Sequence, residues 1–137
     1  MMTAAVADFT PVKSSRSKIK RTKNKLSLEL KPTPDIAARL GQMKSDSQVL
    51  VGFALETENE IRNARKKLEK KNLDFIVLNS LKDEGAGFGK DTNKITIIDR
   101  HNNIKDFELK PKREVAEDIV NELEKCLDDQ KKAMAEE

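Results

Sequence analysis

The chain of 137 residues contains no tryptophan, no tyrosine and only five phenylalanines. Proteins that hold single-stranded nucleic acid stack its bases on aromatic side chains, and this sequence offers few residues for that purpose. The core must therefore be built mainly from leucine, isoleucine, valine and alanine. Apolar residues make up 36% of the chain, which is enough for one modest core, so we expect a single domain over residues 1–137.

Other scarce residues exclude further classes of protein. The only cysteine, Cys126, has no partner for an intramolecular disulfide and falls in a helical pattern, where a structural role is expected. The only histidine, His101, lies in a polar turn sequence, and no metal-ligand spacing occurs elsewhere. No apolar run is long enough to span a membrane, and the first residues lack the pattern of a signal peptide. We therefore expect a cytoplasmic protein without a metal site of its own.

Charge is distributed unevenly, although the formal net charge is only +3. Residues 13–25 carry basic side chains and no acidic one, whereas acids outnumber lysines after Glu114. A solvated arm is one explanation for the basic segment. A site for a polyanion such as a triphosphate is the other.

The first part of the chain reads as strand, arm and strand. Residues 3–7 form a short run typical of a buried strand that ends at Asp8, and such a strand at the very start of a chain suggests a piece of a longer protein. Residues 9–24 contain a proline and several serines that break a helix, which predicts an extended arm. Leucines alternate with polar residues over 25–31, which predicts a strand with one wet face.

The remainder predicts an α/β fold. Thr33 and Pro34 form a helix start, and Thr57 with Glu60 forms a capping box for a second helix. Two apolar runs flank that second helix, so strand, helix and strand form a βαβ unit with parallel strands. The other expected elements are a hairpin over 94–109, a last helix from Pro111 and a frayed tail over 128–137. We therefore predict a partial Rossmann-like parallel sheet with flanking helices, plus the extended basic arm, its strand and a β-hairpin.

Several segments together resemble the ligase half of the bacterial bifunctional enzyme of coenzyme A biosynthesis, the phosphopantothenate-cysteine ligase family. The resemblance covers residues 3 to about 123. It rests on the ordered set Ala4-Ala5-Val6-Ala7-Asp8-Phe9, Lys18-Ile19-Lys20, Pro34-Asp35-Ile36, Val51-Gly52-Phe53-Ala54, Glu56-Thr57, Ala64-Arg65-Lys66-Lys67, Lys71-Asn72-Leu73-Asp74, Asn79, Gly87-Phe88, Asp91 and Asn93.

The resemblance implies an activity. The family joins 4'-phosphopantothenate to the amine of L-cysteine, consumes CTP through an acyl-cytidylate, releases CMP and pyrophosphate and requires Mg²⁺. Family members are homodimers in which the arm and the strand after it (9–31) pair across subunits. The segments that resemble the family come from its carboxy-terminal part. We therefore expect the isolated chain to need the missing amino-terminal half and to turn over poorly or not at all.

The same resemblance implies the site residues. Lys18 is the expected catalytic residue, which would neutralise the phosphates or the charge that develops during acyl transfer. The nucleotide-binding residues that the resemblance implies are Asp8, Lys18, Pro34, Asp35, Ile36, Ala37, Phe53, Lys67 and Lys71.

Several of these residues have a second interpretation. Asp8 could simply start a turn, and Phe53 could be a core residue rather than a platform for cytosine. Lys67 and Lys71 lie one helical turn apart beside the apolar face of their helix. The end of that helix should nevertheless lie away from the usual ligand crevice, so either the nucleotide extends along the helix or the role of Lys71 is doubtful. The loop Gly85–Gly89 resembles a phosphate loop only superficially and is expected to be a mobile loop near the site.

Two other functions remain open. The chain could be a non-catalytic CTP-binding or dimerisation module that works with another chain, or a nucleic-acid binder that uses its basic arm. The lack of aromatics and the acidic last helix argue against nucleic acid. No residue reads the base unambiguously, so the sequence does not separate CTP from ATP on physical grounds.

Overall fold

The computed structural model describes residues 6–20, 25–80 and 89–135. The chain divides into two compact units, residues 1–36 and 37–137. The single domain expected over residues 1–137 stays a prediction. We describe each unit by itself. Most of the strand expected over residues 3–7 lies outside the described residues, and the two of its residues that are described, Val6 and Ala7, are not in a strand.

The first unit is a two-stranded ribbon. Strand β1 (Phe9–Pro11) pairs antiparallel with β2 (Leu30–Pro32). The strand expected over 25–31 is therefore much shorter than predicted. The predicted helix cap at Thr33 is wrong, because the Thr33 hydroxyl donates to the carbonyl of Ala7 at 2.6 Å and its N–H donates to the carbonyl of Asp8 at 2.9 Å.

The second unit is built on a four-stranded sheet. Its strand order is β3-β4-β6-β7, with β3 and β4 parallel and the other neighbours antiparallel. A small antiparallel pair, β5 with β8, lies outside this sheet. Helix α1 begins at Ile36, the last residue of the first unit, and otherwise belongs to the second. The strands and helices of the second unit are α1 (Ile36–Met43), β3 (Val51–Glu56), α2 (Glu60–Lys70), β4 (Phe75–Ser80), β5 (Thr92–Asn93), β6 (Ile95–Asp99), β7 (Ile104–Asp106), β8 (Lys110–Pro111) and α3 (Lys112–Ala135).

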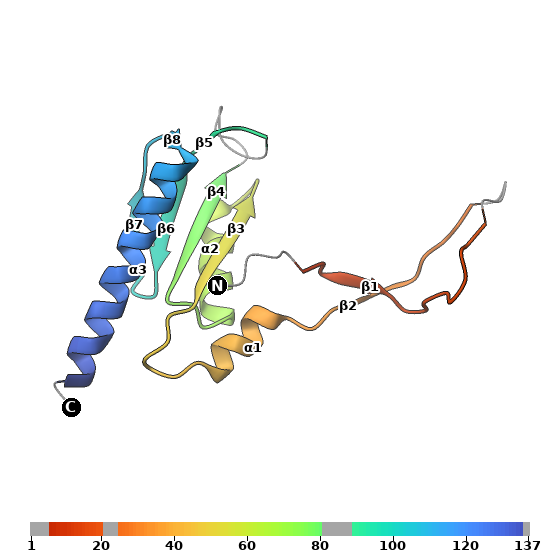
Figure 1. The fold of residues 1–137 in the computed structure, drawn as a ribbon, viewed down its shortest axis with the longest axis horizontal. Coiled ribbons are helices and arrows are strands. Elements are labelled where there is room, and N and C mark those ends of the chain that lie inside the picture. Colours follow the sequence, from red (N-terminus) through yellow and green to blue (C-terminus); the bar gives the residue numbers. More distant parts are fainter. Residues whose placement is uncertain (1–5, 21–24, 81–88, 136–137) are drawn as a thin grey trace. The chain divides into compact units, whose positions relative to one another are not determined.

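Helices cover both faces of the sheet, α2 on one and α3 on the other (Figure 1). Strand β4 is apolar without alternation because side chains on both of its faces are buried. Ile76 and Leu78 pack in the cluster under α2, and Phe75 and Val77 pack in the cluster under α3. The expected α/β class is confirmed, and the sheet is mixed because the hairpin β6–β7 joins β4 antiparallel.

Two predicted helix ends differ from the structure. The capping box at Thr57 is wrong, since α2 begins at Glu60 after Asn59, whose φ of 47° is left-handed and whose side chain makes no cap hydrogen bond. The tail predicted to fray from 128 is helical as far as Ala135. In the part of the chain that the structure describes, no helix is long and apolar enough to cross a membrane.

Two glycines allow close packing in the second unit. A Cβ added at Gly41 on α1 would overlap the carbonyl oxygen of Lys71 and lie 2.8 Å from its carbonyl carbon. The side-chain amide of Asn72 also donates to the Gly41 carbonyl at 2.8 Å, so the end of α2 is held against α1. A Cβ at Gly52 would instead overlap Cδ1 of Leu73, the tip of a flexible side chain.

These two contacts predict different costs for the same substitution. Gly41→Ala should lower the free energy of unfolding by about 2 kcal/mol, because a backbone carbonyl has nowhere to move and the overlap exceeds the gain in helix propensity. Gly52→Ala should lower it by less than about 1 kcal/mol, because Leu73 can change rotamer. Urea unfolding of the two variants checks this, and an equal or larger loss for Gly52→Ala would contradict the packing at Gly41.

Candidate functional site

The candidate site lies where the parallel strands β3 and β4 end. Ligands of open α/β sheets bind outside the carboxyl ends of the strands. Glu56 is the last residue of β3, Ser80 is the last residue of β4, and α2 begins nearby at Glu60. The hydroxyl of Ser80 donates to Glu60 at 3.0 Å, which links the end of β4 to the start of α2.

Lys67 reaches the end of β3 from α2. Its Nζ donates to Oε1 of Glu56 at 2.5 Å, and the side-chain amide of Asn63 donates to Oε2 at 3.2 Å. The same amide also donates to the carbonyl of Glu58 at 2.9 Å. The hydrogen bond from Lys67 lowers the pKa of the Glu56 carboxyl against the opposing effect of burial. The ion pair therefore stabilises the fold above the pKa of an unfolded glutamate, and that stabilisation is lost as the pH falls through the lowered pKa.

Burial separates the lysines of α2 as the helical spacing predicted. Lys67 and Lys71 are half-buried, whereas Lys66 and Lys70 are exposed. Lys71 follows the last turn of α2, and its carbonyl packs on Gly41. The backbone of Lys71 therefore lies at the amino edge of the sheet, away from the carboxyl ends of the strands where ligands of such sheets bind. Binding of a nucleotide by Lys67 or by Lys71 stays a prediction.

Phe53 is not a core residue. Its side chain is 66% exposed on β3, where Leu55, the next residue on the same face, is also exposed. The residue before Phe53, Gly52, is approached closely by the side chain of Leu73. Side chains alternate along a strand, so Phe53 and Glu56 point to opposite faces of β3. The structure thus does not bring Phe53 and Lys67 together on one face, and a ligand that contacts both has to reach around the edge of the strand.

The other predicted site residues lie in or beside the first unit. Lys18 is exposed on the arm between β1 and β2, and Asp8 is exposed directly before β1. Pro34, Asp35 and Ile36 are also exposed, whereas Ala37 belongs to the second unit and is half-buried. Each unit thus holds part of the predicted set. Of the predicted loop Gly85–Gly89, only Gly89 is described.

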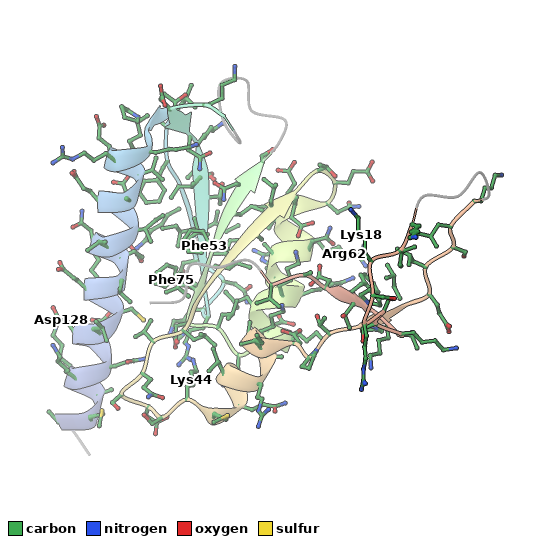
Figure 2. The ribbon with its side chains drawn as sticks, turned by 45° about the vertical axis from the view of Figure 1, so that its right-hand side comes forward. Lys18, Lys44, Phe53, Arg62, Phe75 and Asp128 are labelled. Carbon is green, nitrogen blue, oxygen red and sulfur yellow. The ribbon has the colours of Figure 1, made fainter. Side chains whose placement is uncertain are left out.

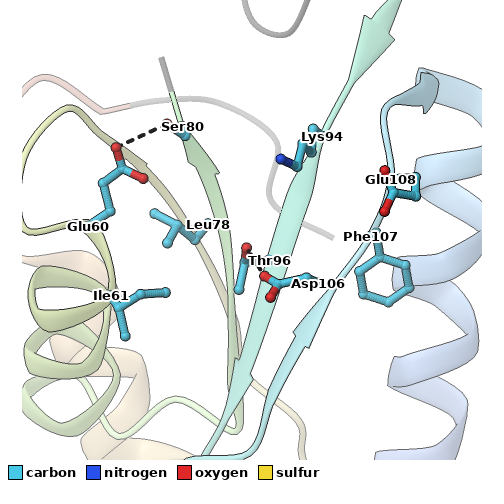
Figure 3. A pocket seen from close by; sticks show the side chains of 9 residues that line it. All are labelled: Glu60, Ile61, Leu78, Ser80, Lys94, Thr96, Asp106, Phe107 and Glu108. Atoms are coloured by element: carbon cyan, nitrogen blue, oxygen red, sulfur yellow. Dashed lines mark hydrogen bonds between the residues drawn. The ribbon is translucent and has the colours of Figure 1, made fainter. Parts of the chain in front are cut away.

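A cavity of about 450 Å³ opens on the α2 side of the sheet (Figure 3). Glu60 and Ser80 line one end, and Lys94, Thr96 and Asp106 line the other. The hydroxyl of Thr96 donates to Asp106 at 2.6 Å. None of the predicted site residues lines this cavity. The sequence suggested a role for Glu60 only as part of a helix cap, and it gave no signal for Lys94 or Asp106.

The opposite end of the sheet holds a buried carboxylate. Asp74, directly before β4, accepts from Nζ of Lys44 at 2.7 Å, from the N–H of Leu50 at 2.6 Å and pairs with Nη2 of Arg100 at 2.6 Å. Figure 2 shows Lys44 at this end, away from the carboxyl ends of β3 and β4. A cavity of about 350 Å³ adjoins the cluster. Sequence reasoning missed this cluster, although Asp74 belongs to a segment that carried the resemblance.

Cys126 lies on α3 near the Asp74 cluster. Burial raises the pKa of its thiol, and the Asp74 carboxylate adds to the effect. The raised pKa disfavours the reactive thiolate form, and the structural role of Cys126 stays a prediction.

Within residues 6–20, 25–80 and 89–135, no three His, Cys, Asp or Glu side chains are placed to hold a metal ion. Mg²⁺ in phosphate chemistry is held by one or two carboxylates together with the substrate phosphates. The described residues therefore form no dedicated metal cage, and Mg²⁺ bound through the phosphates of a nucleotide stays a prediction.

The parallel pair β3–β4 with its connecting helix, in a sheet that is otherwise antiparallel, defines a mixed α/β protein. The model of the DNA/pantothenate metabolism flavoprotein C-terminal domain family matches residues 1–127. The chain belongs to this family, which confirms the resemblance seen in the sequence.

Three relatives define the comparison. The chain is 62% identical to a cysteine/cysteine sulfinic acid decarboxylase from an unknown prokaryotic organism, over 90% of this chain and 34% of the relative. It is 46% identical to the coenzyme A biosynthesis bifunctional protein CoaBC of Bacillus subtilis (strain 168), over 88% of this chain and 30% of the relative. A crystal structure of the C-terminal domain of CoaBC superimposes with a TM-score of 0.68 at 35% identity and covers 92% of this chain and 53% of that one. The chain thus spans about a third of the curated relatives.

Proposed function

We propose that this chain is the CTP-binding part of a phosphopantothenate-cysteine ligase of coenzyme A biosynthesis that acts in the cytoplasm. The observation that carries the proposal is the Lys67 ammonium held at the carboxyl end of β3, in a chain that is similar to CoaBC. A cation at a strand end suits the phosphates of a nucleotide.

The reaction has two steps. The carboxylate of 4'-phosphopantothenate attacks the α-phosphorus of CTP, so that an acyl-cytidylate forms and pyrophosphate leaves. The amine of L-cysteine then attacks the acyl carbon, an amide forms and CMP leaves. Negative charge develops on phosphate oxygens in the first step, and fixed cations lower the barrier by stabilising it.

The residues of this chain supply cations and contacts to the nucleotide. Lys18 on the exposed arm is the proposed catalytic residue, and Lys67 holds phosphate oxygens. Phe53 offers an exposed ring for the base, and Asp8 offers a carboxylate. Mg²⁺ bound to the triphosphate would supply further neutralisation of its charge.

A second candidate follows from the relative that is 62% identical and is named as a decarboxylase of cysteine and cysteine sulfinic acid. In that case the chain is a non-catalytic nucleotide-binding or dimerisation module attached to a different enzyme. Release of CO₂ from either amino acid, with no release of pyrophosphate, would favour it once the rest of the protein is supplied.

Turnover tests the ligase. The chain alone, with 4'-phosphopantothenate, L-cysteine, CTP and Mg²⁺, should release no pyrophosphate above background, because the groups that order phosphopantothenate are expected in the part of the relatives that this chain does not cover. A fusion that places the preceding part of the Bacillus subtilis relative before this chain should be active.

Lys18→Ala in that fusion should lower turnover about 10²–10³-fold, the usual loss when one group that stabilises developing charge is removed. Robust turnover by the chain alone, or full activity of Lys18→Ala, would contradict the proposal.

We also propose that the arm forms a homodimer. Leu26, Leu28 and Leu30 are 66%, 60% and 52% exposed within the first unit. A two-stranded ribbon with exposed leucines is marginally stable alone, and a second copy of the arm would cover the leucines.

Sedimentation tests the dimer. The wild-type chain should sediment as a dimer at micromolar concentration, and Leu28→Asp should sediment as a monomer because a charge is placed in the apolar contact. Met134→Asp, at a site that is 54% exposed on α3, is the matched control and should remain a dimer. A wild-type monomer at high concentration would exclude this interface.

A further inference from the structure

Glu56 has no role in the proposed function so far, although the segment Glu56-Thr57 helped to carry the resemblance. The Glu56 side chain is only 12% exposed at the end of β3. Both of its carboxylate oxygens are engaged, one by Lys67 and the other by the amide of Asn63. A buried carboxylate with two donors has a fixed orientation.

Of the two side chains in this ion pair, that of Lys67 is the more exposed to solvent. Its side chain is 45% exposed, and an ammonium has three N–H donors. Among the residues that the structure describes, its hydrogen bond goes to Glu56, which uses one donor and leaves two others for a ligand that arrives from solvent. A free lysine side chain has many rotamers, which binding would have to restrict. The bond to Glu56 restricts them in advance.

We propose that Glu56 is a positioning residue, which holds the Lys67 ammonium at the carboxyl end of β3 so that it meets a nucleotide phosphate already oriented. This inference rests on the proposed binding of CTP. Asn63 contributes to the same positioning, because its hydrogen bond orients the Glu56 carboxylate. That carboxylate in turn holds the Lys67 ammonium.

Two other roles for Glu56 make different predictions. If the pair only stabilises the fold, its loss lowers the melting temperature and leaves nucleotide affinity unchanged. If the carboxylate competes with phosphate for Lys67, its loss tightens binding. Glu56→Gln distinguishes these roles, since the amide oxygen still accepts from Lys67 while the negative charge is gone.

A matched ion pair elsewhere in the chain provides the control. Lys105 on β7 pairs with Glu122 on α3 at 2.5 Å, and the two side chains are 45% and 13% exposed. These exposed fractions nearly equal those of Lys67 and Glu56, which are 45% and 12%. Glu122→Ala thus removes a carboxylate of the same burial from a pair on the other side of the sheet, outside the predicted site.

The experiment measures the Kd of Mg·CTP and of tripolyphosphate by calorimetry on the full 137-residue chain. Glu56→Ala should raise both Kd values about fivefold to tenfold, because binding then has to restrict the lysine. Glu56→Gln should recover most of the loss, and Glu122→Ala should have no effect. In a Lys67→Ala background, Glu56→Ala should cause no further loss, since it acts through that lysine. Circular dichroism confirms that each variant is folded.

Each outcome decides the inference. An unchanged Kd for Glu56→Ala, a tighter Kd for Glu56→Gln, or an additive loss in the Lys67→Ala background would overturn the positioning role while CTP binding stands. If the wild-type chain binds tripolyphosphate with the expected pattern of variants but does not bind CTP, the positioning role holds and the CTP proposal fails. If the wild-type chain binds neither ligand, both proposals fail.

Discussion

The second unit depends on the buried carboxylate of Asp74. This carboxylate binds Lys44, which follows α1, the N–H of Leu50 just before β3, and Arg100 in the turn between β6 and β7. The backbone of Asp74 adds two more bonds, from its N–H to the carbonyl of Leu50 and from the N–H of Arg100 to its own carbonyl. Removing one partner of a buried ion pair typically costs about 3–5 kcal/mol, because the other charge is left without compensation. Asp74 therefore fixes the start of β4 against β3, and the register of the two parallel strands follows from it.

The two ends of the sheet hold ion pairs that differ in their exposure to solvent. Both have a lysine on a buried carboxylate, but Lys44 is 11% exposed and Lys67 is 45% exposed. The Lys44–Asp74 pair is nearly closed to solvent and links the segment after α1 to the start of β4. An open pair such as Lys67–Glu56 can receive a ligand. Because the amino ends of the strands are held by Asp74, the carboxyl ends can carry side chains chosen for binding.

The sequence predicted elements that depend on local patterns. The apolar runs of β3 and β4, the 3.6-residue period of α2 and the turn at Asp99 were all visible, and the structure confirms these elements. The helix caps at Thr33 and Thr57 were wrong, because contacts with Ala7 and the left-handed Asn59 override local preference. The partners of Asp74 could not be predicted, since Lys44 and Arg100 lie far from it along the chain. For the site, spacing identified Lys67 as inward-reaching, but only the folded chain shows that Glu56 receives it.

We propose that a nucleotide meets this chain at the carboxyl end of β3, beside Lys67. Titration of the ¹⁵N-labelled chain with Mg·CTP, followed by amide and lysine side-chain chemical shifts, tests it most directly. We expect the largest shifts in the second unit at Glu56, Asn63 and Lys67, and none at Asp74 or Arg100. Shifts centred on the Asp74 cluster, with none at the end of β3, would contradict it.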